Sequence, residues 1–168
     1  MELKDALKTA LDFEIKGHKI YEEVSNKTEN EIIARTFRYL ADQELIHIQA
    51  IKEYMGKSGA IPFTNVNRDS LKGMKQFFNT TITEFKKKTE LSDDDIKAHE
   101  TGLELEKSSY DFYKEKFQNS KDPKAKKFFE WLMVQENAHY ELIRNTYDFI
   151  KNPVAFYTEE ERWMADGG

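Results

Sequence analysis

The sequence predicts an all-α protein in which four long helices pack as a bundle. Three observations support this fold class: charged residues are abundant, helix breakers are few, and apolar residues recur with a period near 3.6 in four long segments. Of the 168 residues, 34% are charged and 39% are hydrophobic, with seven Gly and three Pro. Such a composition favours helices, and this length suffices to bury one core. We therefore expect residues 1–168 to form a single domain.

The first two helical segments are expected to form a hairpin. The first runs from about Leu3 to Lys27, and the second begins near Thr28. The sequence T-E-N-E at 28–31 predicts a capping box that uses Glu31, and Gly56 is typical of the C′ position that ends a helix. The apolar faces of the two segments contain Leu7, Ala10, Leu11, Gly17, Tyr21, Val24, Ile33, Phe37, Leu40, Ala41, Ile48 and Ile51.

The third and fourth segments have clearer start signals. Ser92 precedes three aspartates, a pattern that caps a helix and places acid at the positive end of its dipole. Asp122 precedes Pro123, which is typical of the first helical position, and the last helix should end near Asn152. The apolar faces contain Leu103, Tyr110, Tyr113, Phe117, Phe129, Leu132, Met133, Tyr140 and Ile143.

Two segments lie outside these four helices. The connection 57–91 is too long for a tight bundle loop, so we expect a crossover along the bundle. Its first part, to about Asp69, looks irregular, and a short amphipathic helix should follow over about 70–88. The C-terminal tail, 152–168, is aromatic enough to pack on the bundle, with a frayed end.

Composition excludes several classes of function. The chain has no Cys, which removes disulfides, thiol catalysis and cysteine-ligated metals. A net charge of −5 with scattered Lys argues against nucleic acid, and no stretch approaches the roughly 20 apolar residues of a membrane span. The N-terminal residues lack the apolar core of a signal peptide. We expect a cytoplasmic protein that binds neither nucleic acid nor membrane.

The two halves of the chain repeat one pattern at an offset of 92 residues. ALDFEIKGHKIYEE at 10–23 matches GLELEKSSYDFYKE at 102–115, and FRYLADQELIHIQAI at 37–51 matches FEWLMVQENAHYELI at 129–143. The repeat spans about 3–56 and 92–151. It places polar residues at equivalent points of the apolar faces: Glu14 and Glu106, Glu44 and Glu136, His47 and His139, Tyr21 and Tyr113.

Four ionised carboxylates buried together need positive charge beside them. Without it, burial would cost several kcal/mol per charge, and mutual repulsion would raise the pKa of each group. No Lys or Arg lies on these four faces at the neighbouring turns, so a pair of divalent cations is the better source. Because E-x-x-H places both side chains on one helix face, four Glu and two His can hold two metals with one imidazole each.

A single E-x-x-H motif is weak evidence. With 31 acidic residues in 168, each His has roughly a one-in-five chance of an acid three positions before it. The prediction of a metal site depends instead on two E-x-x-H motifs at one offset. Each motif is accompanied by a Glu on the preceding helix. His18 and His99 lack an acid at that spacing and are expected not to be ligands.

Tyr21 and Tyr113 each follow a repeat Glu by seven residues, two turns along the same face. Plain aromatic packing would explain them. We expect instead that they hydrogen bond to the carboxylates and position them for catalysis.

The pattern E-x6-Y, E-x-x-H, E-x6-Y, E-x-x-H resembles that of the ferritin-like di-iron carboxylate proteins, and among them the rubrerythrin branch. The resemblance covers Leu3 to Lys151 and implies a ferritin-like four-helix bundle. It also implies two iron ions, for which manganese or zinc would accept the same donors. The ligands it implies are Glu14, Glu44, His47, Glu106, Glu136 and His139.

The chain departs from the rubrerythrin pattern at two points. Full-length rubrerythrins carry a cysteine-ligated rubredoxin domain, so a chain without Cys implies an external electron donor such as a rubredoxin-like protein. Typical members also have an extra Glu three residues after the third-helix Glu. Here Ser109 stands at that position and Gly17 at its equivalent in the repeat, which implies a more symmetric site.

The resemblance implies an oxidoreductase that reduces hydrogen peroxide or dioxygen in defence against oxidative stress. An iron-binding protein with ferroxidase activity for iron sequestration is the alternative. A metal-free helical interaction module with buried, protonated Glu residues is a third reading. We expect a homodimer, whereas iron storage would require a larger shell.

Overall fold

The computed structural model describes residues 2–57, 64–84, 90–153 and 156. These ranges contain five helices and no strand, which confirms the all-α fold class. The helices are α1 (Leu3–Lys27), α2 (Glu31–Lys57), α3 (Thr64–Glu84), α4 (Asp93–Asn119) and α5 (Pro123–Lys151).

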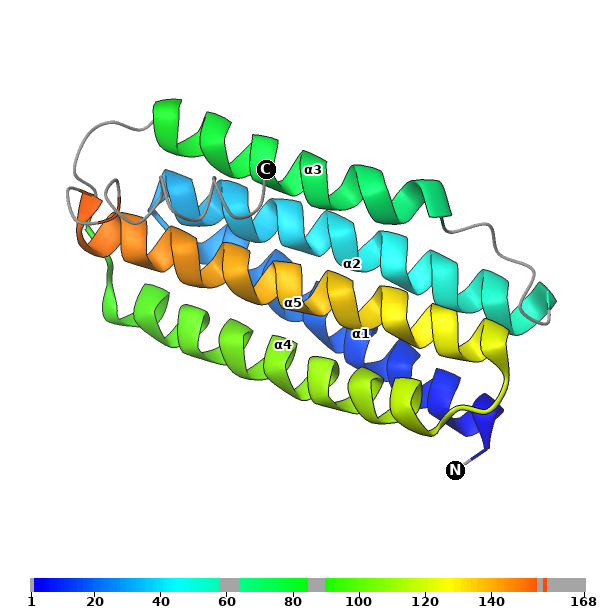
Figure 1. The fold of residues 1–168 in the computed structure, drawn as a ribbon. Coiled ribbons are helices and arrows are strands. Elements are labelled where there is room, and N and C mark those ends of the chain that lie inside the picture. The colour runs from blue at the N-terminus through cyan, green and yellow to red at the C-terminus, as the bar shows by residue number, and fades with distance from the viewer. Residues whose placement is uncertain (1, 58–63, 85–89, 154–155, 157–168) are drawn as a thin grey trace.

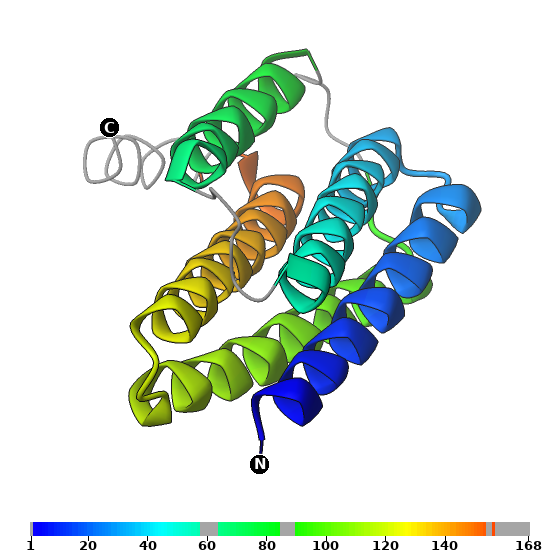
Figure 2. The same cartoon turned by 90° about the vertical axis from the view of Figure 1, so that its right-hand side faces the viewer.

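The bundle consists of two helical hairpins that pack against each other. α1 and α2 form one hairpin and α4 and α5 the other (Figure 1). Viewed along the bundle, α1 and α4 form one layer and α2 and α5 the next (Figure 2). α3 lies outside α2 and α5, on the side away from α1 and α4. The repeated segments of the sequence therefore face each other in space.

The start signals of α4 and α5 are confirmed. The Ser92 side chain accepts a hydrogen bond from the backbone N–H of Asp95, and the Asp95 carboxylate accepts one from the backbone N–H of Ser92. The Asp122 side chain caps α5, with Pro123 in the first turn, and Asn152 is the C-cap. Both signals depend on neighbouring residues alone, and for this reason they could be recognised in the sequence.

The expected boundaries of α2 are wrong by a few residues. Asn30 caps the helix, because its side-chain oxygen accepts hydrogen bonds from the backbone N–H groups of Ile32 and Ile33. The Thr28 hydroxyl instead donates to Asp95 Oδ1 at 2.6 Å, so a contact with α4 removes it from the predicted capping box. Gly56 lies inside the helix, which continues to Lys57.

The crossover contains a longer helix than the sequence predicts. Residues 64–69, expected to be irregular, form the first turns of α3, and 70–84 continue it. In the sequence, Gly59 and Pro62 come shortly before this helix, and such residues are typical of the segment that precedes a helix. Residues 58–63 and 85–89 lie outside the described ranges. α3 is held by buried Met74, Phe78 and Ile82 and by the Tyr39–Phe77 stack, at 4.2 Å between ring centroids.

The apolar core forms two clusters at different heights in the bundle. One contains Phe37, Leu40 and Ile143, together with the buried residues of α3. The other contains Ile51, Phe129 and Leu132. Between these positions on α2 and α5 lies the E-x-x-H pair of each helix, so a polar layer separates the two clusters.

Phe156 is the aromatic residue of the C-terminal tail that lies within the described ranges. This side chain is buried against Phe78 and Phe149, with ring centroids at 5.5 Å in each pair. Residues 154–155 and 157–168 lie outside the described ranges. Within those ranges, no helix is both long enough and apolar enough to cross a membrane.

Candidate metal centre

Six repeat side chains converge in the polar layer at the middle of the bundle. Each of the four bundle helices contributes a Glu, and α2 and α5 also contribute a His. The six side chains are at most 2% exposed: Glu14, Glu44, His47, Glu106, Glu136 and His139. Their convergence follows from the repeat, because equivalent positions on two facing hairpins meet at one height.

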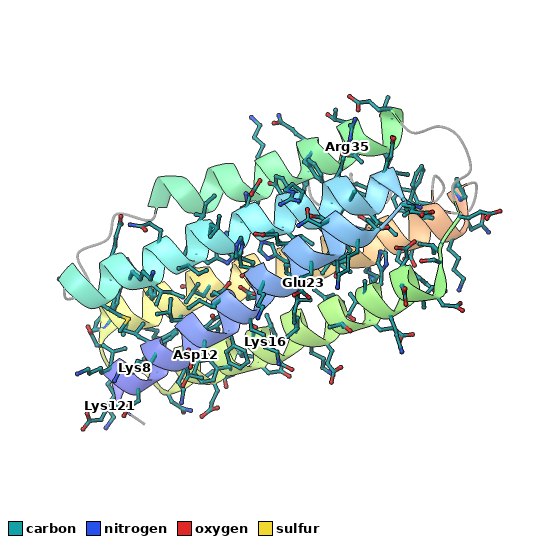
Figure 3. The ribbon with its side chains drawn as sticks, turned by 180° about the vertical axis from the view of Figure 1, so that it is seen from behind. Lys8, Asp12, Lys16, Glu23, Arg35 and Lys121 are labelled. Atoms are coloured by element: carbon teal, nitrogen blue, oxygen red, sulfur yellow. The ribbon has the colours of Figure 1, made fainter. Side chains whose placement is uncertain are left out.

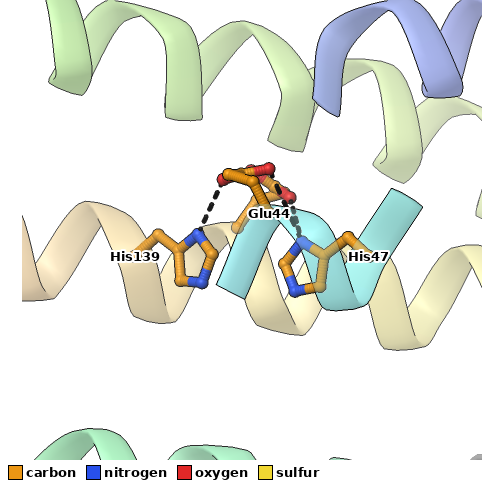
Figure 4. Close-up of side chains that lie close together, drawn as sticks. Glu44, His47 and His139 are labelled. Carbon is orange, nitrogen blue, oxygen red and sulfur yellow. Dashed lines mark hydrogen bonds and ion pairs between the residues drawn. The ribbon is translucent and has the colours of Figure 1, made fainter. Parts of the chain in front are cut away.

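The two imidazoles face the carboxylates through their Nδ1 atoms. His47 Nδ1 lies 3.1 Å from Glu14 Oε2 and 3.4 Å from Glu136 Oε1. His139 Nδ1 lies 3.2 Å from Glu44 Oε1. Figure 4 shows the two rings side by side below Glu44, and their planes are 11° apart with centroids at 5.0 Å.

His139 Nδ1 also lies 3.4 Å from Glu106 Oε1, and His47 Nδ1 lies 3.8 Å from Glu44 Oε2. Glu44 thus lies between the two histidines. Glu44 is therefore a carboxylate that both imidazoles share.

The two tyrosines bind across the bundle and not within their own hairpin. The Tyr21 hydroxyl donates to Glu106 Oε1, and the Tyr113 hydroxyl donates to Glu14 Oε1, both at 2.6 Å. Each tyrosine therefore holds the carboxylate of the opposite repeat. The repeat in the sequence is symmetric, so it could not distinguish these partners from the Glu on the same helix.

Burial strongly raises the pKa of both tyrosine hydroxyls, and the adjacent carboxylates raise it further. The hydroxyls therefore stay protonated at any ordinary pH. They act as permanent hydrogen-bond donors to Glu14 and Glu106.

The carboxylates of the cluster do not pair with any lysine or arginine in the described ranges. Across the residues that the structure describes, the four glutamates form ion pairs with His47 and His139 alone. Lys8 and Lys16 of α1 lie on the exposed outer surface (Figure 3). The positive charge that balances this cluster must come from the two imidazoles or from bound cations.

Protons alone can balance the cluster. Burial by itself would lower the pKa of both imidazoles, but Glu14 raises that of His47 to about 10 and Glu106 raises that of His139 to about 9. Burial would raise the pKa of Glu14 and Glu106, but the adjacent imidazoles hold it below the usual range.

The other two carboxyls shift in the opposite direction. Burial raises the pKa of Glu44 to about 8, with a further contribution from the Glu14 carboxylate. Burial and the Glu106 carboxylate raise the pKa of Glu136 well above its usual value. At neutral pH, two ionised carboxylates thus face two protonated imidazoles. The expectation that side chains could not supply the counter-charge is incomplete, because the histidines supply it.

The donor set fits a pair of divalent cations. The ligand atoms of Glu44, His47, Glu136 and His139 lie within 4.8 Å of one another. Glu106 Oε2 is buried and has no hydrogen-bond partner, which leaves a carboxylate oxygen available to a cation. Carboxylate oxygen with one imidazole per ion suits iron, manganese or zinc.

Ser109, at the position of the extra Glu of the rubrerythrin pattern, and its repeat equivalent Gly17 add no donor atom to the cluster. The Ser109 hydroxyl donates to the backbone oxygen of Leu105 on its own helix, at 3.0 Å. Gly17 leaves room for Glu44, because a Cβ atom added there would lie 3.4 Å from Glu44 Cδ. A Cβ atom at position 17 would thus be in van der Waals contact with Glu44, and a larger side chain would press against it.

The remaining two histidines lie outside the cluster. His18 Nδ1 is 2.9 Å from the backbone oxygen of Ala41, and its Nε2 is 3.1 Å from Glu22. His99 Nδ1 donates to the backbone oxygen of Asp95 at 2.8 Å. Burial lowers the pKa of His99, so its ring is neutral at pH 7.

Two residues beside the cluster were not singled out by sequence reasoning. The Trp131 ring meets His47 edge to face, with centroids at 5.5 Å. Gln135 is fully buried one residue before Glu136. Gln43 and Gln135 occupy equivalent positions of the repeat, and this match is the sequence signal that could have identified Gln135. The sequence does not show which of the two is buried, because their different exposure arises from the packing of the bundle.

The helical arrangement and the buried cluster define a ferritin-like bundle with a candidate two-metal carboxylate centre. A rubrerythrin family model matches residues 5–147. The chain belongs to the rubrerythrin family, as the sequence pattern predicts. Among curated proteins and among solved structures, the comparisons find no match.

Proposed function

We propose that this chain is a di-iron carboxylate oxidoreductase that reduces hydrogen peroxide or dioxygen with electrons from an external donor. One observation carries the proposal: four carboxylates and two imidazoles from four helices meet in a layer that is at most 2% exposed. Membership of the rubrerythrin family supports peroxide or oxygen chemistry at this layer.

The six converging side chains would hold the two ions. Glu44, from a central turn of α2, lies next to both imidazoles, and Glu136, from a central turn of α5, lies next to that of His47. Glu14 and Glu106 lie on α1 and α4, each next to one histidine. When bound, two iron ions would supply two electrons together and so avoid the release of a one-electron product.

The other groups of the site would control geometry and water. The hydroxyls of Tyr113 and Tyr21 each hold one oxygen of a carboxylate, which fixes the direction of the second oxygen. The apolar clusters above and below the layer exclude bulk water, which strengthens each electrostatic contact inside.

Rapid mixing tests the proposed activity. The metal-free protein is loaded anaerobically with about two Fe(II) per chain and mixed with hydrogen peroxide or with dioxygen. We expect iron oxidation much faster than that of free Fe(II) under the same conditions. A Glu130→Ala variant, altered at an exposed position of α5, is the matched control and should react like the wild type. Oxidation no faster than free Fe(II) with either oxidant would refute the redox function.

The size of the assembly separates this function from iron storage. Size-exclusion chromatography with light scattering should show a homodimer. A large closed shell that retains many iron ions per chain would instead favour sequestration.

A further inference from the structure

The outer nitrogen atoms of the two site histidines lack hydrogen-bond partners. The Nε2 atoms of His47 and His139 are buried and unpaired. Figure 4 shows both rings directing one nitrogen toward Glu44 and the other away from it. A histidine that binds metal usually donates its second N–H to an acceptor, which fixes the ring and its tautomer. Each outer nitrogen therefore requires an acceptor.

Gln135 is a buried amide on the same helix as His139. It is 0% exposed, and neither its amide oxygen nor its amide nitrogen has a hydrogen-bond partner. It precedes His139 by four residues on α5, so the two side chains share one face. Helical side chains lean toward the N-terminus, which directs the His139 ring toward Gln135. A buried amide group without a partner is destabilising, so packing alone does not account for Gln135.

We propose that Gln135 is a positioning residue for His139. No direct hydrogen bond joins the two groups in this structure. After a change of the Gln135 rotamer, or through one enclosed water, its amide oxygen accepts a hydrogen bond from His139 Nε2–H and keeps Nδ1 directed at the carboxylates. This inference rests on the proposed metal centre, which gives the orientation of His139 its importance.

The repeat supplies an internal comparison. Gln43 stands in the same relation to His47, four residues before it on α2, but Gln43 is partly exposed and can bind solvent. The His47 ring is bordered instead by the edge of Trp131. A buried amide thus supports only one of two otherwise equivalent histidines. The metal position next to His139 should therefore be the tighter of the two.

Matched variants test this asymmetry. Gln135→Met keeps the length of the side chain and removes the amide, and Gln43→Met makes the same change in the other repeat. Anaerobic calorimetric titration with Co(II) counts the bound ions, and the visible absorption of Co(II) reports their ligands. We expect Q135M to weaken one of the two positions about 10–100-fold and to change the Co(II) spectrum. Q43M should stay within about threefold of the wild type, and Q135E should rescue binding because its carboxylate is also an acceptor.

A metal-free measurement separates this inference from the proposed function. In the NMR spectrum of the metal-free protein, the Nε2–H proton of His139 should be protected from exchange, and Q135M should abolish that protection while Q43M leaves it unchanged. If the wild type binds neither Co(II) nor Fe(II), the proposed metal centre is refuted. The NMR measurement does not depend on metal, so it still shows whether His139 donates a hydrogen bond to Gln135. Unchanged exchange in Q135M, or equal losses of affinity in Q135M and Q43M, would overturn the role of Gln135.

Discussion

Replacing Tyr113 by Phe should destabilise the metal-free protein by about 1.5–3 kcal/mol, the range for a hydrogen bond to a charged group. The hydroxyl donates to Glu14 Oε1 at 2.6 Å, and the two residues are 0% and 1% exposed, so water cannot replace the lost donor. The ring itself stays in place, because Phe fills the same space. Tyr21→Phe should cost a similar amount, since Tyr21 makes the equivalent bond to Glu106.

Urea denaturation in the presence of a chelator, followed by circular dichroism, measures this effect. For a chain of this size the expected loss corresponds to a melting temperature roughly 3–12 °C lower. Tyr110→Phe is the matched control on the same helix, because Tyr110 is only partly buried, and it should change stability by less than about 0.5 kcal/mol. A loss below about 0.5 kcal/mol for Tyr113→Phe would refute the argument that these tyrosines hold the carboxylates.

Three further predictions concern the metal centre. A Glu44→Ala, Glu136→Ala variant, purified without chelator, should lose the metal that the wild type retains; elemental analysis checks this, and full retention would contradict the ligand assignment. Gly17→Val should weaken Fe(II) binding at least about tenfold, as measured by anaerobic titration. The reason is that a Cβ atom at position 17 would already lie 3.4 Å from the Glu44 carboxyl carbon, so the two Cγ atoms of Val would displace Glu44. Unchanged affinity would show that Glu44 has space to move. Burial alone would lower the pKa of the imidazoles, but the carboxylates raise it to about 10 for His47 and about 9 for His139, so protons compete with the metal at neutral pH. Fe(II) affinity should consequently fall as the pH is lowered from 8 to 6, by up to about tenfold per pH unit for each proton displaced, and a pH-independent affinity would contradict this.

The sequence predicted the parts of the structure that depend on local chemistry or on the repeat. The caps at Ser92 and Asp122 use neighbouring residues, and both are present. The polar side chains share one offset, so the sequence is sufficient to predict their convergence. Their role as metal ligands remains a prediction, which the geometry supports.

The features that the sequence did not predict depend on contacts between distant segments. Thr28 was expected to cap α2, but its hydroxyl bonds to Asp95 of α4, and Asn30 takes its place. The carboxylate partner of each tyrosine is set by how the hairpins face each other, which a symmetric repeat leaves open. The full burial of Gln135, in contrast to Gln43, likewise arises only in the packed bundle.

Anomalous scattering at the iron absorption edge tests the central claim most directly. Crystals of protein loaded anaerobically with Fe(II) should give two peaks in the polar layer of the bundle, one next to the Nδ1 atom of His47 and the other next to that of His139. A single peak, peaks only at the protein surface, or no peak would contradict a two-metal centre built from the repeated Glu and His residues.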